Sequence, residues 1–279
     1  MAKKTITTFQ NLKNNNEKIA MLTAYDYSTA KIIEEADIDA ILVGDSLAMV
    51  ALGYENTYSI TVEEMKIFVQ AVARGAKESF IIADMPFMSY NVSIEQGLKN
   101  AGEMIKAGAN AIKLEGCNEH ILELIKRCVE CGIPVLGHLG LTPQLLNTIG
   151  GYKIQGKTAK NIDMIYQNAK KLEEAGVFAI VLELMPTEGA EYITANLNIP
   201  TIGIGAGVGC DGQIVVTDDI IGKFTDFVPK FVRRFTNINE AMLKAFREYI
   251  KEVKDSNFPS PKESFELTEE EKGRLNDIK

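Results

Sequence analysis

The chain has 279 residues, of which 46% are hydrophobic and 24% are charged, and its formal net charge at pH 7 is −8. These proportions are typical of a soluble globular protein, and the acidic balance argues against a general nucleic-acid binder, which presents a basic face. No apolar run approaches the roughly 18 residues of a membrane span, and the N-terminal MAKKTITTFQ lacks the apolar stretch of a secretory signal, so we expect a cytoplasmic protein without nucleic-acid or membrane partners.

Short apolar runs alternate with helical patterns along the whole chain. We expect strands at residues 18–25, 40–46, 80–86, 111–116, 134–140, 178–184, 200–207 and 212–219. These runs are nearly continuous in Ile, Val and Leu, which is typical of strands buried on both faces of a parallel sheet. Three of the helical patterns end at Gly108, Gly132 and Gly176 directly before a strand, where glycine accepts the left-handed conformation of a helix C-terminus.

Eight such units predict a (β/α)8 TIM barrel with additional C-terminal helices. A doubly wound open sheet is the alternative, but no G-x-G-x-x-G follows the first strand, and the glycine-rich GIGAGVG comes at the seventh strand instead. We expect residues 1–279 to form a single barrel domain. Within it, residues 238–279 are predicted to be a C-terminal helical extension and polar tail.

Polar and charged side chains interrupt these strands near their C-terminal ends. In chain order they are Asp45, Ser46, Asp84, Lys113, Glu115, His138 and Glu183. In a barrel these strand ends converge on one mouth and build the active site. One aspartate after a strand is usually a turn or helix-capping residue, but charged residues are rarely buried unless they are paired or bind a ligand. Their recurrence at successive strand ends therefore favours a site.

The charges of this predicted site do not balance, because four carboxylates surround one lysine. A hard divalent cation would compensate the excess, and Mg²⁺ usually takes one or two carboxylates together with waters or substrate oxygens. Such an ion suits a chelating oxo acid and stabilises an enolate as a Lewis acid. One carboxylate would remain free to accept a proton, and the residues alone do not decide which one.

Seven sequence blocks resemble the ketopantoate hydroxymethyltransferase family. In order between about residues 5 and 265, they are VGDSLAM, IIADMPFMSY, GANAIKLEG, PVLGHLGLTPQ, GGYKIQGKT, VLELMP and IGIGAGVGCDGQI. The resemblance implies a barrel of the phosphoenolpyruvate/pyruvate type. It also implies transfer of a hydroxymethyl group from 5,10-methylenetetrahydrofolate to 3-methyl-2-oxobutanoate, giving 2-dehydropantoate (ketopantoate) in pantothenate and coenzyme A biosynthesis. The implied partners are a small 2-oxo acid, a folate and further copies of the chain, commonly in a decamer.

The resemblance further implies a metal site at the second, third and fourth strands. Asp45 and Asp84 are expected to hold one Mg²⁺ per subunit, with Glu115 beside the ion directly or through water. The oxo acid is expected to chelate this ion through its keto oxygen and carboxylate. Asp45 and Asp84 thereby also belong to the expected substrate-binding set.

The remaining roles concern the substrate and the proton. Ser46 and Lys113 are expected to hold the oxo acid, and the lysine also to counter the charge of the enolate. Glu183 matches the general base of the family, which removes the proton from C3. His138 is expected to bind the substrate or relay a proton, with a hydrogen-bonded structural histidine as the alternative.

Two other functions remain open at this point. One is another metal-dependent 2-oxo-acid aldolase or lyase on the same barrel, and the other is a non-catalytic barrel scaffold. Lyases of the isocitrate type generally carry a catalytic cysteine in a K-K-C-G-H loop, which this chain lacks, and a scaffold predicts loss of the strand-end charges. The chain departs from the family pattern at Ala48, where glycine is usual, and in the loop 53–61, which has Ser59–Ile60 where a proline is common.

Overall fold

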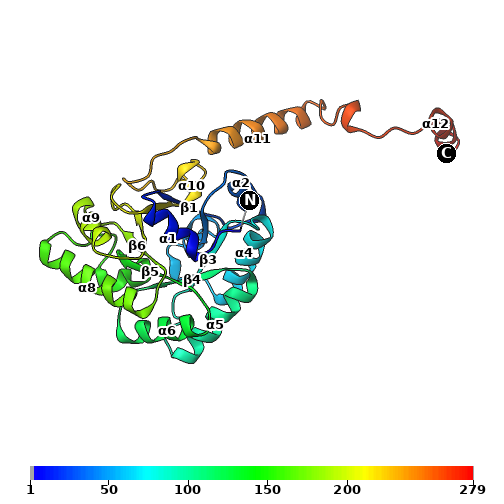
Figure 1. Ribbon diagram of the computed structural model, residues 1–279. Helices are drawn as coiled ribbons and strands as arrows, with labels where there is room; N and C mark the ends of the chain where they lie inside the picture. Colours follow the sequence, from blue (N-terminus) through cyan, green and yellow to red (C-terminus); the bar gives the residue numbers. More distant parts are fainter. Residues whose placement is uncertain (1–2, 279) are drawn as a thin grey trace.

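The computed structural model, which describes residues 3–278, contains a closed barrel of parallel strands (Figure 1). The strands are β1 (Ile19–Thr23), β2 (Ala40–Val43), β3 (Phe80–Asp84), β4 (Ala111–Glu115), β5 (Val135–Gly140), β6 (Ala179–Glu183), β7 (Thr201–Ile204) and β8 (Gly212–Val215). Each strand pairs with its neighbours in chain order, and β8 closes the barrel on β1. The predicted (β/α)8 fold is therefore confirmed, and the open-sheet alternative is wrong.

Helices alternate with these strands. They are α1 (Ile6–Asn14), α2 (Tyr27–Glu35), α3 (Leu47–Val50), α4 (Val62–Gly75), α5 (Ile94–Ala107), α6 (Glu119–Glu130), α7 (Leu146–Ile149), α8 (Ala159–Ala175), α9 (Thr187–Ala195), α10 (Thr217–Ile220), α11 (Ile238–Lys254) and α12 (Glu269–Asn276), with 3-10 turns η1 (Thr57–Ser59), η2 (Pro143–Leu145) and η3 (Pro261–Glu263). Helix α5 illustrates the local signals: Ser93 accepts a hydrogen bond from the Gln96 N–H at its start, and Gly108 ends it with a φ of 116°. The predicted strand 212–219 is shorter than expected because α10 begins at Thr217.

The N-terminal end of the barrel is closed by α1. Phe9 of this helix is buried, and its ring lies 5.4 Å from that of Phe80 and 5.2 Å from that of Phe178, between ring centroids. Both pairs meet edge to face, an arrangement that aromatic rings prefer. This aromatic plug fills the N-terminal end, so the interior of the barrel is accessible from the opposite end, where the strands finish.

The C-terminal helices extend away from the barrel (Figure 1). Helix α11 begins at Ile238, and neither it nor α12 has a buried residue. The additional C-terminal helices are thus confirmed, while the assignment of the whole chain to one domain stays a prediction. Within residues 3–278, none of the helices has both the length and the apolar character that crossing a lipid bilayer requires.

Candidate active site

A cavity of about 560 Å³ lies at the C-terminal ends of the strands. All seven residues predicted from strand ends line it, namely Asp45, Ser46, Asp84, Lys113, Glu115, His138 and Glu183. They belong to, or directly follow, five different strands, and the closed parallel topology brings them together. The expected convergence is therefore observed, while the individual roles of these residues stay predictions.

Lys113 lies among the carboxylates at the bottom of the cavity. Its Nζ is 3.1 Å from Asp84 Oδ1 and 3.4 Å from Glu115 Oε1, and all three side chains are buried. Burial alone would lower the pKa of Lys113, but the charges of Asp84, Glu115 and Asp45 outweigh it and raise that pKa. Lys113 is therefore a fixed cation within an acidic cluster.

Asp45 and Asp84 are neighbouring buried carboxyls whose ionised forms are unfavourable. Asp84 Oδ2 accepts a hydrogen bond of 2.9 Å from the Asp45 backbone N–H. Its Oδ1 is in ionic contact with Lys113 but accepts no aligned hydrogen bond from the described residues. Burial raises the pKa of both carboxyls, and the charges of Asp84 and Glu115 raise that of Asp45 further. A cation beside them would relieve this penalty.

Glu115 is engaged differently. Its Oε1 lies 3.4 Å from Lys113 Nζ and 3.3 Å from His138 Nδ1, and its Oε2 accepts a 3.0 Å hydrogen bond from the Gln144 backbone N–H. Among residues 3–278, no three or more histidine, cysteine or acidic side chains are grouped so that they could hold a metal ion. Since Mg²⁺ needs only one or two carboxylates, Asp45 and Asp84 fit such an ion, and Glu115 fits a contact through water better than direct ligation.

His138 bridges two carboxylates. Its Nδ1 is 3.3 Å from Glu115 Oε1, and its Nε2 is 3.2 Å from Glu183 Oε2. Burial and the Lys113 charge act to lower the pKa of His138, but the charge of Glu115 and the contacts with both glutamates raise it to about 9. Nε2 has no aligned hydrogen-bond partner among residues 3–278, so the 3.2 Å contact with Glu183 Oε2, rather than a hydrogen bond, is what supports a positioning role for His138.

Glu183 and Ser46 lie at opposite parts of the cavity. Glu183 ends β6, which stands across the closed barrel from β2, and its side chain is 16% exposed. It is thus separated from Asp45 yet accessible from the cavity. Ser46 follows β2, and its Oγ lies 2.8 Å from the Tyr25 hydroxyl, whose pKa is raised by burial. Ser46 lines the cavity, and Tyr25 supports its hydroxyl from outside the lining.

Sequence reasoning missed Gln144, which ties the carboxylates together. Its Nε2 donates 2.9 Å hydrogen bonds to Asp45 Oδ2 and to the Met85 carbonyl, and its backbone N–H donates to Glu115. The Tyr90 hydroxyl in turn donates to Gln144 Oε1 at 2.7 Å. The residue ends the LTPQ stretch after β5, and no local pattern indicated it, because its role depends on partners from other segments.

Comparisons with known proteins agree with this geometry. A family model described as ketopantoate hydroxymethyltransferase matches residues 3–261. The chain belongs to this family. A relative from Clostridium novyi, named 3-methyl-2-oxobutanoate hydroxymethyltransferase, is 54% identical over 268 residues, which are 96% of this chain and 97% of the relative. A relative of the same name from Enterococcus faecalis is 52% identical over 96% of this chain and 98% of its own length. The expected ketopantoate hydroxymethyltransferase resemblance is therefore confirmed.

Solved structures outside the ketopantoate hydroxymethyltransferase family share the fold. A phosphonopyruvate hydrolase in complex with oxalate and Mg²⁺ is 15% identical, with a TM-score of 0.59 over 99% of this chain and 98% of that one. A 2,3-dimethylmalate lyase of the PEP mutase/isocitrate lyase superfamily is 16% identical, with a TM-score of 0.59 over 98% and 94%. At these identities the likeness concerns the fold alone.

Proposed function

We propose that this chain transfers a hydroxymethyl group from 5,10-methylenetetrahydrofolate to 3-methyl-2-oxobutanoate, giving 2-dehydropantoate for pantothenate and coenzyme A synthesis. The observation that carries the proposal is that four carboxylates, one lysine and one histidine from the ends of strands converge on a single cavity. Relatives that are 52% and 54% identical over nearly the whole chain bear the name of this enzyme. The cavity and the relatives thus point to one chemistry.

The oxo acid binds at the bottom of the cavity. The Lys113 ammonium attracts the carboxylate of the oxo acid and offsets the negative charge that develops on its keto oxygen. The Ser46 hydroxyl donates a hydrogen bond to the carboxylate of the oxo acid. Asp45 and Asp84 would hold one Mg²⁺ per subunit, with Glu115 in contact through water. When bound, this ion supplies Lewis-acid stabilisation of the enolate. The support for this assignment is that both carboxyls are buried side by side and their pKa values are raised despite the contacts with Lys113 and Gln144.

Glu183 accepts the proton from C3 of the oxo acid. A proton next to a ketone is weakly acidic, so the base must be ionised and oriented toward the carbon. His138 provides that orientation through its contact with Glu183 Oε2. One water adds to the methylene carbon as its bonds to N5 and N10 of the folate break, which gives tetrahydrofolate and a one-carbon unit at the oxidation level of formaldehyde. The enolate C3 then bonds to this carbon, and its oxygen takes up the proton held by Glu183 and becomes the product hydroxyl.

The test is to incubate the purified protein with 3-methyl-2-oxobutanoate, Mg²⁺ and 5,10-methylenetetrahydrofolate and to follow ketopantoate by mass spectrometry. Product is expected, and omission of any one component should abolish it. Absence of product together with metal-dependent cleavage of another 2-oxo acid would favour an aldolase or lyase instead. A folded protein that turns over none of these substrates would favour the scaffold.

We also propose that copies of this chain assemble into a homo-oligomer, namely a decamer. Helix α11 supports it, because exposed apolar side chains recur along the helix: Met242, Phe246, Tyr249, Ile250 and Val253. On the barrel, Ala20 of β1 and Gln213 of β8 are exposed on outward-facing positions, and a helix from a second copy would cover them. Light scattering should give a multiple of 30.7 kDa, and a monomer mass would contradict the assembly. Cytoplasmic location stays a prediction.

A further inference from the structure

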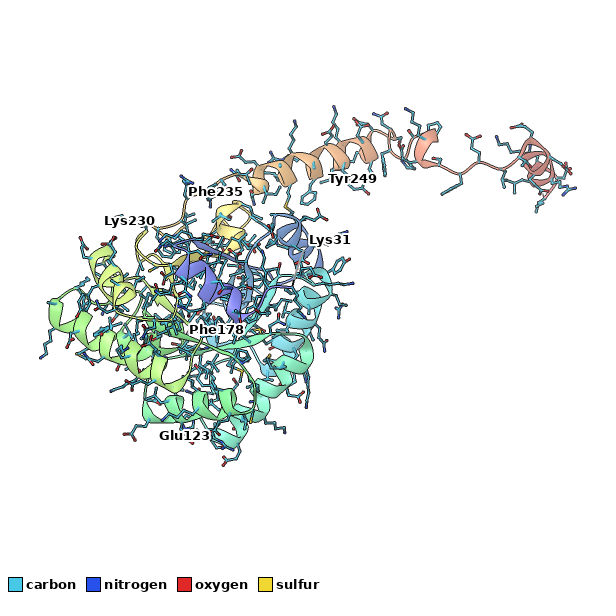
Figure 2. All side chains as sticks on the ribbon, viewed as in Figure 1. Lys31, Glu123, Phe178, Lys230, Phe235 and Tyr249 are labelled. Carbon is cyan, nitrogen blue, oxygen red and sulfur yellow. The ribbon has the colours of Figure 1, made fainter. Side chains whose placement is uncertain are left out.

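The segment between α10 and α11 borders the cavity from the side opposite its charged bottom. Five of its residues line the cavity, namely Phe224, Phe227, Pro229, Lys230 and Phe231. Figure 2 labels Lys230 and Phe235 on this segment, Lys230 at the edge of the barrel and Phe235 close to the start of α11. We call residues 221–237 the mouth segment. Its contribution is aromatic and cationic, whereas the bottom of the cavity is mainly acidic.

Both ends of the mouth segment are fixed to α10. Near its start, the Phe224 N–H donates to the Asp218 carbonyl at 3.1 Å, and near its end, the Phe235 N–H donates to the Ile220 carbonyl at 2.8 Å. Arg234 joins the two ends of the segment to each other, because its Nη2 donates a 3.2 Å hydrogen bond to the Phe224 carbonyl. Residues 225–233 therefore form a loop whose two ends are held in place by hydrogen bonds.

Phe231 is seated on the backbone of the barrel. Gly205 follows β7 with a φ of 62°, and a Cβ on it would lie 2.7 Å from the Phe231 ring. The ring therefore needs glycine beneath it, which gives a physical reason for one glycine of GIGAGVG. Phe231 remains 39% exposed and lines the cavity, so part of its surface is available to a ligand.

Lys230 lines the cavity and, within residues 3–278, has no acidic partner. Lys223 of the same segment is paired with Asp218 at 3.0 Å. Lys230 lines the cavity, and no acidic group within residues 3–278 forms an ion pair with it. Phe227, also a lining residue, is 68% exposed. These neighbours fit a ligand that is aromatic in one part and anionic in another.

The cavity is also larger than a small oxo acid requires. Its 560 Å³ falls within the roughly 300–1,000 Å³ of pockets that hold drug-sized ligands. We propose that Phe227, Lys230 and Phe231 form the binding site of the folate donor, with the two rings packing on its aromatic part and Lys230 pairing with a glutamyl carboxylate. This inference rests on the proposed function, which supplies a folate as the second substrate.

The pairing can be tested with two ligands that differ in the glutamyl group. Isothermal titration calorimetry would compare tetrahydrofolate with tetrahydropteroate, which lacks glutamate, in the presence of Mg²⁺ and 3-methyl-2-oxobutanoate. The wild type should bind tetrahydrofolate about fivefold more tightly, as one partly exposed charge pair allows. In Lys230→Ala the two ligands should bind equally. Phe231→Ala should instead weaken both ligands by a similar factor, because stacking does not involve the glutamate.

Two controls separate binding from folding and from the reaction itself. Lys223→Ala removes a cation from the same segment outside the cavity, and it should keep the wild-type preference for tetrahydrofolate. Exchange of the C3 proton in deuterated water, which needs the oxo acid but no folate, should also be unchanged in Lys223→Ala. A wild-type preference that persists in Lys230→Ala, or vanishes equally in Lys223→Ala, would overturn the folate site. Loss of exchange and product in the wild type would instead overturn the proposed function.

Discussion

The bottom and the mouth of the cavity differ in the chemistry of their side chains, in their burial and in the backbone that carries them. At the bottom, charged groups stand on the ends of strands and are buried, as with Lys113, which is 5% exposed. At the mouth, aromatic groups and a lysine stand on an irregular segment, where Phe227 is 68% exposed. The bottom is held by contacts between charged groups of neighbouring strands, and the mouth by backbone hydrogen bonds at its two ends.

This difference suits two different tasks. Proton removal from carbon needs groups that are positioned before the substrate arrives, and rigid strand ends provide that positioning. A large second substrate must enter and its product must leave, which favours an open, exposed surface. The division predicts that variants at the bottom affect the first chemical step, whereas variants at the mouth affect only the second substrate.

The largest expected effect comes from Glu183→Gln at the bottom. Loss of a general base typically costs 10²–10⁴-fold, so exchange of the C3 proton should fall about a thousandfold. NMR in deuterated water with 3-methyl-2-oxobutanoate and Mg²⁺ measures this rate. Calorimetric Mg²⁺ binding should stay close to wild type because Asp45 and Asp84 are untouched. Exchange at the wild-type rate would remove Glu183 as the base.

Asp84→Asn tests the metal site directly. The change removes one of the two carboxylates that fit the ion. The Mg²⁺ concentration for half-maximal exchange should therefore rise about a hundredfold, the upper end of the effect of residues that only support metal ligands. Asp226→Asn, on the exposed mouth segment, removes the same charge outside the acidic cluster and serves as the matched control. An equal Mg²⁺ requirement in both variants would show that Asp84 does not hold the metal.

The sequence predicted the bottom of the cavity much better than its mouth. Apolar runs mark the strands, and a charge such as Lys113 inside a run is conspicuous because burying it is costly. The topology then makes convergence a necessity, since parallel strands of a barrel end at one face. All the predicted cavity residues could therefore be found from local pattern plus one architectural rule.

The mouth could not be found in this way. Phe231 lines the cavity because Gly205, which follows β7, leaves room for its ring, and that contact has no local pattern. Gln144 likewise gains its role from partners on three other segments. The family departures fall in such regions as well: Ala48 is fully buried in α3, and the loop 53–61 contains η1. Loop conformation depends on tertiary contacts that a single sequence does not display.

Gln144→Leu tests whether the hydrogen bonds behind the carboxylates matter for the reaction. Residues that orient metal ligands typically contribute 10–100-fold. Because Asp45 loses its hydrogen-bond donor, apparent Mg²⁺ affinity in the exchange assay should fall about tenfold. Asn168→Leu, an amide removed on α8 outside the cavity, is the control for a general effect of replacing a polar side chain. Wild-type Mg²⁺ affinity in Gln144→Leu would limit the residue to a structural role.

The smallest effect, and the sharpest separation of mouth from bottom, is expected for Gly205→Ala. The new methyl group would lie 2.7 Å from the Phe231 ring, so the ring must move away from its position against residue 205. Tetrahydrofolate affinity should fall about fivefold, the middle of the range for one displaced aromatic contact. Calorimetry measures the affinity, and the exchange rate without folate should remain that of the wild type.

Backbone strain alone is excluded by a matched glycine. Gly132 also has a positive φ, of 79°, but a Cβ there would meet no atom within 4 Å. Both alanine variants should therefore lose a similar free energy of unfolding, about 1 kcal/mol for a left-handed alanine, as measured by urea denaturation. Gly205→Ala alone should bind tetrahydrofolate more weakly. Equal folate affinity in the two variants would contradict the link between Phe231 and the second substrate, because the clash with the ring is the difference between them.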